Sequence, residues 1–209
     1  PMGLQYSITA IGSVILQSAV NTLGSDAVAS VTAASKISMF IVCPFDSMGA
    51  TMATYGGQNA GGYKLDRLHK GLGSCIILGA VYSVIGLLII AAFGPHLLKL
   101  FVSGSETGIL ADAQHFLLIN GLFYFPLALV NIVRFMIQGM GFGFFAIIAG
   151  VLEMAARTLV GAVFVPIFGY NAACFASPLA WIFADCFLIP AYFVVWNRMK
   201  RHKEAYRQV

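Results

Sequence analysis

One acidic and one basic residue stand four positions apart inside an apolar stretch, and this pair is the pattern in the sequence best suited to chemistry. Glu153 and Arg157 lie within Ile148–Gly161, whose other residues are uncharged. Residues four apart share one face of a helix, with the acid on the favourable N-terminal side. A charge at the centre of a bilayer costs about 2.5 to 3.5 kcal/mol by insertion scales. We therefore expect the two side chains to neutralise each other and to face a polar interior.

Arg134 is a third member of the expected charge cluster. The segment Gly139–Gly143 is a tight turn between two apolar stretches, which predicts two antiparallel neighbouring helices. At about 1.5 Å per residue, Arg134 and Glu153 reach comparable depths on them. Glu153 is then held between Arg157 and Arg134. Two interpretations stay open, because the cluster is either functional or only pins the two helices together.

A polar stripe accompanies Arg134 along the same predicted helix. Its members are spaced by 4, 7, 3 and 4 residues and are Asn120, Tyr124, Asn131, Arg134 and Gln138. Such a stripe is typical of a helix that lines an aqueous cavity, and the alternative is polar contact between helices.

Asp46 is the lone intramembrane carboxylate best placed to bind a cation. It follows Pro44 by two residues, and a proline removes a backbone hydrogen bond and should kink its helix. The freed carbonyl oxygens could join the carboxylate in coordination. The alternative is pairing with a cationic side chain elsewhere. Lys36 is expected to extend towards the outer interface, and Asp185 has no local partner that would assign it a role.

Composition shows that the solvent for most of this chain is lipid. Of 209 residues, 59% are hydrophobic and 10% are charged, against about 25% charged in ordinary soluble domains. Several uncharged stretches approach or exceed the roughly 18 to 20 residues that cross hydrocarbon as a helix. The expected fold is an all-α integral membrane domain, residues 1–196, followed by a basic tail, 197–209. Its six transmembrane helices are expected at about 4–23, 28–57, 72–93, 116–138, 144–165 and 175–196.

The positive charges are clustered and predict the orientation. Lys64, Arg67 and Lys70 share one short predicted loop, and five further Lys and Arg residues lie in the tail. By the positive-inside rule both segments are cytoplasmic, and with six spans the start of the chain is cytoplasmic as well. The pI near 9.0 is therefore a topology signal and not a sign of nucleic-acid binding.

Enzymatic and metal-binding patterns do not occur in the sequence. HExxH, GxSxG and GxxxxGK[ST] are absent, and the four histidines fall in loops, the tail or the edges of predicted spans. The four cysteines lie singly, without a CxxC pair, and are interpreted as small packing residues. We expect no enzyme activity, no metal site and no cofactor.

The most specific stretch is PFDSMGATMATYGGQNAGGYKLDRLHKG, Pro44–Gly71. It resembles the proline-containing helix and following loop, GQNxGAxxxDRxxxG, of the second half of MATE (multidrug and toxic compound extrusion) transporters. The matching positions are Gly57, Gln58, Asn59, Gly61, Asp66, Arg67 and Gly71, with Gly62 where the family usually has alanine. Three further stretches are similar to the same family: Pro1–Ser13, Ile132–Gly141 and Gly150–Gly161.

This resemblance implies that the chain is the C-terminal six-helix half, helices seven to twelve, of a twelve-helix transporter. The family builds two six-helix lobes around a central cavity and exports mostly cationic, amphipathic small molecules in exchange for Na⁺ or H⁺. The expected partners are thus the bilayer, an N-terminal lobe of the same polypeptide and a cationic substrate. The expected location is a cytoplasmic membrane, such as a bacterial inner membrane. A chain that starts at Pro1 without an initiator methionine fits a segment of something longer.

The resemblance also sets open questions. A well-known branch of the family carries a glutamate in helix seven and an aspartate in helix ten as a cation site, where this chain offers Gln5, Thr9, Asn120 and Asn131. That cation site cannot be carried over, so coupling would use Asp46, the Glu153 cluster or a carboxylate of the other lobe. The Glu153 and Arg157 pair could act as a latch that changes partners between inward-open and outward-open states.

Two alternative functions remain at this stage. One is a flippase for lipid-linked precursors from the same superfamily, which would want a more cationic cavity than Arg134 and Arg157 provide. The other is a half-size transporter in which two six-helix copies form a dimer.

Overall fold

The fold is a bundle of long helices. The computed structural model describes the backbone of residues 2–207 and the side chains of residues 3 and 7–201. Within that range all regular secondary structure is helical. The elements are α1 (Met2–Asn21), α2 (Ser25–Gly61), α3 (Leu65–Leu98), α4 (Thr107–Leu122), α5 (Tyr124–Gly139), α6 (Gly143–Leu159), a π-helical turn η1 (Val160–Phe164), α7 (Val165–Phe168) and α8 (Tyr170–Arg207).

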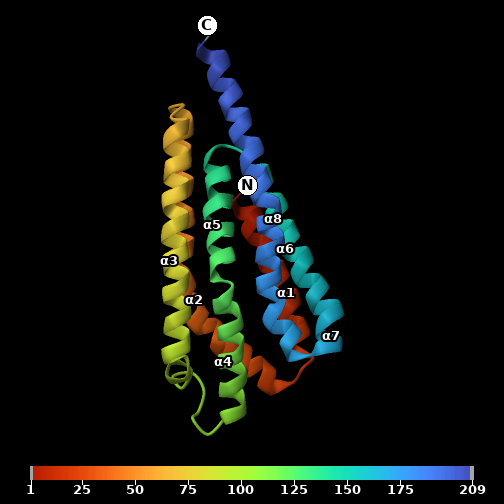
Figure 1. Ribbon diagram of the computed structural model, residues 1–209. Helices are drawn as coiled ribbons and strands as arrows, with labels where there is room; N and C mark the ends of the chain where they lie inside the picture. Colours follow the sequence, from red (N-terminus) through yellow and green to blue (C-terminus); the bar gives the residue numbers. More distant parts are fainter. Residues whose placement is uncertain (1, 208–209) are drawn as a thin grey trace.

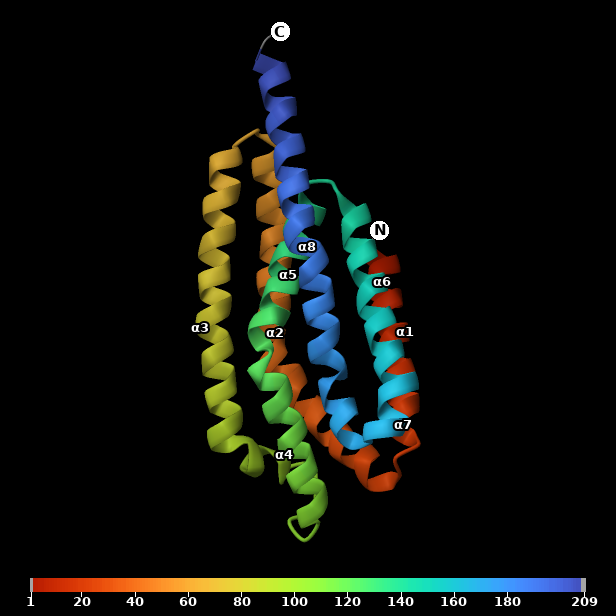
Figure 2. The same cartoon turned by 45° about the vertical axis from the view of Figure 1, so that its right-hand side comes forward.

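The helices form two groups that meet at the centre of the bundle. In one group α2 packs against α3, α4 and α5, and in the other α6 packs against α1 and α8. The two groups are joined mainly by contacts of α5 with α8 and α6. Figures 1 and 2 show α1 and α2 diverging from their common turn, α1 towards α6 and α2 towards α3. The space between the two groups is therefore where a polar cavity can form.

The fourth predicted span is two helices and not one. α4 and α5 meet at Phe123 with a bend of 51°. Pro126 stands in the first turn of α5 and has no backbone N–H to donate to the carbonyl of Leu122, so the regular hydrogen-bond ladder cannot continue across this point. The sequence predicted one span at about 116–138, and the structure places a bend inside it, so the polar stripe along it changes direction halfway.

The other predicted spans have helical counterparts that are mostly longer than expected. Among the described residues, four helical segments are long and apolar enough to cross a membrane, and the bent pair α4 and α5 gives a fifth if the pair is counted as one span. In α1 the described apolar part is Ser7–Asn21, which is shorter than the roughly 18 to 20 residues of a full span. α3 starts at Leu65 and so includes most of the predicted basic loop. α8 continues through much of the predicted tail, to Arg207.

Both basic segments, the turn between α2 and α3 and the C-terminal part of α8, lie at the same end of the bundle (Figure 1). The turn between α2 and α3 and the C-terminal part of α8 lie at the upper end in Figure 1, and the turn between α1 and α2 lies at the opposite end. That lower turn passes through Gly24, whose φ of 102° is a backbone conformation that glycine adopts without steric cost. The clustering of charge at one end agrees with the pattern from which orientation was predicted.

α2 contains Pro44 and remains helical from Ser25 to Gly61. Figure 2 shows its first part crossing the lower end of the bundle obliquely before the helix runs alongside α3. The hydroxyl of Tyr82 on α3 donates a hydrogen bond of 3.0 Å to the carbonyl oxygen of Ile41, in the turn before Pro44, where a proline weakens the backbone ladder. α3 thus supports α2 at the position of the proline.

Close backbone contact holds α2 to α5. A β-carbon placed on Gly139 would overlap the carbonyl group of Ala53, so only glycine permits this approach. A β-carbon placed on Gly56 of α2 would lie 3.0 Å from the sulfur and 3.1 Å from the carbonyl oxygen of Met136 on α5. Small residues at such contacts are typical of helix packing in membranes, where van der Waals contact replaces the hydrophobic effect between helices.

Candidate functional site: a charged cavity inside the bundle

The centre of the candidate site is the ion cluster around Glu153. One carboxylate oxygen of Glu153 contacts Nη2 of Arg134 on α5. The other oxygen lies 3.4 Å from Nη2 of Arg157, one turn further along α6. The Glu153 side chain is 3% exposed, and both arginines are also buried. The expected position of Glu153 between the two arginines is therefore the observed one.

Asp185 on α8 is a fourth ionisable residue beside the cluster. It is buried, and the positive charge of Arg134 acts on its carboxylate. Its Oδ1 atom has no hydrogen-bond partner among the described residues. Sequence reasoning gave Asp185 no role, because its partner comes from a different helix. With Asp185 included, two guanidinium groups and two carboxyl groups lie in this part of the bundle.

A cavity of about 170 Å³ adjoins this cluster between the two helix groups. It is lined by side chains from α1, α2, α5, α6 and α8. The polar lining residues are Thr9, Asp46, Asn131, Arg134, Glu153 and Arg157, and the others are Leu127, Val130, Phe135 and Trp181. Five of the residues proposed from sequence, Asp46, Asn131, Arg134, Glu153 and Arg157, thus line one cavity.

The cavity has an exposed mouth and a buried base. Asp46 is exposed and Thr9 partly exposed, whereas Asn131, Glu153 and Arg157 are buried. Nη1 of Arg157 is buried and has no hydrogen-bond partner among the described residues. A buried guanidinium N–H without a protein partner requires water or another acceptor. The base of the cavity is therefore a polar surface that is only partly satisfied by the protein.

Size and charge decide what this cavity can hold. Drug-sized ligands occupy pockets of about 300 to 1,000 Å³, so a space of about 170 Å³ fits a small ion with a few waters and not a drug. The cavity and the adjoining Asp185 place three carboxylates against two guanidinium groups. Asp46 is the carboxyl group of this set that stands at the exposed mouth of the cavity, where a cation can reach it.

The remaining stripe residues lie away from the cavity. Nδ2 of Asn120 donates to the carbonyl oxygens of Phe116, at 2.9 Å, and Cys174, at 3.4 Å, so this side chain joins α4 to α8. Tyr124 is buried and its ring centroid lies 5.8 Å from that of Phe45. These two positions match the alternative of contact between helices, and neither lines this cavity.

Gln138 and Gln5 are two further residues predicted for the site. Gln138 is partly buried near the end of α5, is not among the residues that line the cavity, and its Oε1 has no hydrogen-bond partner in the described part of the chain. Gln5 belongs to α1, one turn before Thr9, but its side chain lies outside the described residues. Trp181 and Thr9 were missing from the predicted site, because only the tertiary fold brings α8 and α1 to the cavity.

The GQN and DR residues lie at the basic end of the bundle and not at the cavity. Gly57 and Gln58 belong to the last part of α2, which Gly61 ends, and Asp66 and Arg67 belong to the first turn of α3. The side chain of Asn59 is buried and donates to the carbonyl oxygen of Tyr55 at 2.9 Å, which helps to order the end of α2. These residues shape the turn between the two helices.

Tyr55 fastens α2 to α3 at this turn. Its hydroxyl donates a 2.8 Å hydrogen bond to the carbonyl oxygen of Arg67. Its ring occupies the space that a β-carbon at Gly71 would need. Gly71, the last residue of the Pro44–Gly71 stretch, is therefore a glycine because the Tyr55 ring packs against its α-carbon.

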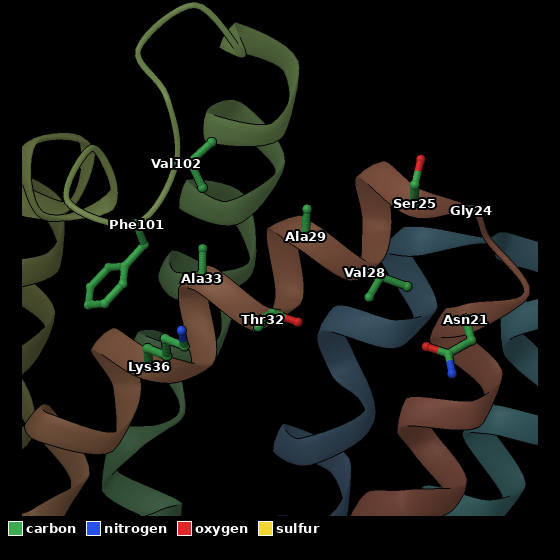
Figure 3. Close-up of a pocket in the computed structure, with 10 residues that line it drawn as sticks. All are labelled: Asn21, Gly24, Ser25, Val28, Ala29, Thr32, Ala33, Lys36, Phe101 and Val102. Carbon is green, nitrogen blue, oxygen red and sulfur yellow. The ribbon is translucent and has the colours of Figure 1, made fainter.

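A larger groove of about 520 Å³ lies at the opposite end of the bundle, along the first part of α2. Figure 3 shows Asn21 and Ser25 near one end of the groove and Lys36 and Phe101 near the other. The ammonium nitrogen of Lys36 lies 5.5 Å from the centroid of the Phe101 ring. Lys36 is exposed and lies at the end away from the basic turn, where it was expected to reach an interface.

A bundle of membrane-length helices with a buried ion cluster defines a multi-pass membrane protein, and comparison with known proteins assigns its family. The sequence pattern of the MatE family matches residues 1–167. The chain belongs to the MatE family, whose members are transporters and not enzymes. A comparison with curated proteins finds no match.

Solved structures of MATE transporters share the fold. An outward-facing multidrug resistance MATE transporter of the MOP superfamily superposes with a TM-score of 0.83 at 20% identity, over 95% of this chain and 44% of that chain. An inward-facing one gives 0.78 at 19% identity, over 96% of this chain and 46% of that chain. A MOP superfamily transporter from Pyrococcus furiosus, described as having a binding pocket of reverse polarity, gives 0.77 at 18%, over 90% and 42%. The chain thus spans less than half the length of these structures.

Proposed function

We propose that the chain forms the second lobe of a cation-coupled antiporter, which exports cationic amphipathic compounds across a cytoplasmic membrane by alternating access. The observation that carries this proposal is the small cavity with the carboxyl group of Asp46 at its mouth and the Glu153 cluster at its base. Ionisable residues inside membrane bundles are typical of ion pathways and proton relays. Na⁺ or H⁺ is the coupling ion that this cavity would accept.

The exposed face of α2 supports the presence of a second lobe. Its exposed residues include a polar series spaced by one to four residues along the second half of the helix: Asp46, Ser47, Thr51, Thr54 and Gln58. The opposite face of the same segment, which includes Phe45 and Met52, is buried within the bundle. Polar groups at membrane depth are costly against lipid. This face would therefore meet water or an N-terminal lobe, and the substrate would bind between the lobes.

The arrangement proposed for the membrane follows from charge. The basic turn between α2 and α3 and the basic end of α8 would both face the cytoplasm, as the positive-inside rule requires. Both ends of this segment would then lie on the cytoplasmic side, in a bacterial inner membrane or its equivalent. Cysteine accessibility at Gly62 and at Gly104, probed in whole cells with a membrane-impermeant thiol reagent, tests it. Labelling at Gly62 rather than Gly104 would contradict this orientation.

The cavity also separates this proposal from the flippase alternative. Both arginines are paired with the carboxylate of Glu153, whereas the head group of a lipid-linked precursor would require cations that are not already neutralised. A half-size dimer would keep the same cavity in each copy, so the oligomeric state of the full-length protein decides that alternative.

Transport by the full-length protein in membrane vesicles provides the test. We expect ethidium efflux that stops when an ionophore dissipates the Na⁺ or H⁺ gradient. Asp46→Asn should abolish the gradient dependence, whereas Glu106→Gln, a matched change of an exposed carboxylate in the loop before α4, should leave it intact. Coupled efflux that persists in Asp46→Asn would place the coupling carboxylate elsewhere, and efflux that ignores both gradients would overturn the antiporter assignment.

A further inference from the structure

A second cavity, of about 330 Å³, lies on the outside of the bundle between α3 and α8. We refer to it as the α3–α8 groove. Leu129 and Val133 of α5 are at its floor, His69 and Gly73 lie on the α3 side, and Tyr192 and Phe193 lie on the α8 side. His69, Gly73 and Phe193 are exposed, so the groove opens away from the bundle. Figure 1 shows α5 between α3 and α8 at this end of the molecule.

Three aromatic rings connect the two walls at the end of the groove near the basic turn. The His69 ring lies 5.2 Å from the Trp196 ring and 6.4 Å from the Tyr192 ring, measured between centroids. Nδ1 of His69 is 3.4 Å from the Tyr192 hydroxyl. Amphipathic aromatic rings are enriched where a membrane protein crosses the lipid head groups. The ring cluster therefore marks head-group depth, and the apolar groove lies below it.

Basic residues lie beyond the aromatic rings, on the side away from the apolar groove. On α8, Ile189, Phe193, Trp196 and Lys200 follow one another at spacings of 4, 3 and 4 residues, which places all of them on one helix face. On α3, Lys70 follows His69 directly. Lys70 and Lys200 are both exposed. The sequence of surfaces along the membrane normal is thus apolar groove, aromatic rings, then cations.

We propose that the α3–α8 groove binds one anionic phospholipid of the cytoplasmic leaflet. An acyl chain would occupy the apolar floor over Leu129 and Val133. The phosphate would lie beyond the rings, within reach of Lys70 and Lys200. Basic sites between transmembrane helices on the cytoplasmic side are suited to anionic head groups. The groove faces away from the polar face of α2, so this site is separate from transport and does not depend on the antiporter proposal.

Charge complementarity favours a lipid over another protein helix as the occupant. A packed helix would need an apolar or small-residue surface along its whole length. Here the apolar surface ends at the ring cluster, and the described cations at this end of α3 and α8 outnumber the single acid, Asp66. A molecule with an apolar chain and an anionic end matches both parts of the surface.

Photo-crosslinking to the full-length transporter in nanodiscs tests the site. The probes are phosphatidylglycerol and phosphatidylcholine that carry the same photoreactive acyl chain, and the readout is the amount of each probe attached to peptides of α3 and α8. We expect phosphatidylglycerol to label Leu72–Ile76 and Ile189–Phe193 in preference to phosphatidylcholine. Equal labelling by the two lipids would overturn the proposed anionic specificity.

Two kinds of variant test the binding of the lipid acyl chain and the binding of the lipid head group separately. A β-carbon at Gly73 would have no atom within 4 Å, so a side chain can start there, and Gly73→Leu should occupy the groove and lower labelling by both lipids at least five-fold. Gly108→Leu, at another open helix position, is its control. Lys70→Gln with Lys200→Gln should lower the preference for phosphatidylglycerol by about five-fold per lysine and leave phosphatidylcholine labelling unchanged. Unchanged labelling in Gly73→Leu would show that the groove holds no acyl chain.

Discussion

Glu153 and Arg157 are one turn apart on α6, and their charged groups lie 3.4 Å apart while both side chains are almost completely buried. Arg134 on α5 contacts the same carboxylate, so Glu153 forms ion pairs with two arginines. Removing one partner of a buried ion pair is more damaging than its presence is stabilising, because an uncompensated charge is left behind. The cluster therefore makes the bundle sensitive to the loss of Glu153.

We expect Glu153→Gln to lower the free energy of unfolding by about 3 to 5 kcal/mol, measured as a lower melting temperature of the purified full-length protein. The amide keeps the shape and removes the charge, which leaves Arg157 without its carboxylate partner. The control is Glu106→Gln, whose carboxylate is exposed. A melting temperature equal to that of the control would show that the cluster does not stabilise the fold.

A second variant distinguishes a cluster that changes partners during transport from one that only holds α5 and α6 together. Glu153→Gln combined with Arg157→Gln removes the uncompensated charge and should recover part of the lost melting temperature. If the cluster changes partners during transport, ethidium efflux will stay low in this stable double variant. Recovery of efflux together with stability would mean that the cluster only holds α5 and α6 together.

The two glycines at 71 and 73 should respond in opposite ways to alanine. Gly73→Ala adds a β-carbon in open space and should stabilise α3 by up to about 1 kcal/mol through helix propensity. Gly71→Ala displaces the Tyr55 ring and should break the hydrogen bond to Arg67, which offsets that gain. Melting temperatures check the difference, and a double-mutant cycle of Gly71→Ala with Tyr55→Phe should show strong coupling. Equal effects of the two alanines would contradict the observed packing.

The two asparagines of the bent span should separate structure from transport. Asn120→Leu loses hydrogen bonds between α4 and α8 and should cost on the order of 1 kcal/mol, seen as a lower melting temperature with coupled efflux retained. Asn131→Leu removes a polar group from the cavity wall and should reduce coupled efflux at least ten-fold with little change in melting temperature. The reverse pattern would mean that Asn120 lies on the ion pathway.

Gly139→Ala should weaken the contact between α2 and α5. The new β-carbon would meet the backbone of Ala53, which cannot rotate away as a side chain can. A cost of about 1 to 3 kcal/mol is expected for overpacking of this kind, measured by thermal unfolding. Gly108→Ala provides the control because its β-carbon would meet nothing within 4 Å. An unchanged melting temperature would indicate that the two helices separate freely.

The sequence predicted those features of the site that depend on local spacing. Glu153 and Arg157 are paired because four residues make one helical turn, and Arg134 joins them because a short turn at Gly141 makes its helix an antiparallel neighbour. Thr9, Trp181 and Asp185 were not predicted as cavity or cluster members. Their helices reach the site only through tertiary packing, which leaves no periodic signal in one sequence.

The bend at Phe123 was missed although Pro126 gives a signal for it in the sequence. Hydropathy responds to the apolar run across this region and not to the interrupted hydrogen bond, so the run was interpreted as one span. For the same reason several spans, such as the one at 72–93, were predicted shorter than the helices that contain them. Lys64–Lys70 are polar enough to leave the hydrocarbon, but polarity does not end a helix, and α3 already begins at Leu65.

The hairpin formed by α2 and α3 is long enough to offer a binding site for an antibody fragment outside the membrane. At 37 and 34 residues the helices measure about 55 and 50 Å, against a hydrocarbon core of about 30 Å, so part of the hairpin stands in water. Its tip is stiffened by the bond from Tyr55 to Arg67. An antibody fragment raised against residues 61–67 would therefore move rigidly with this half of the molecule, and its tilt in single-particle images would report how the bundle rotates.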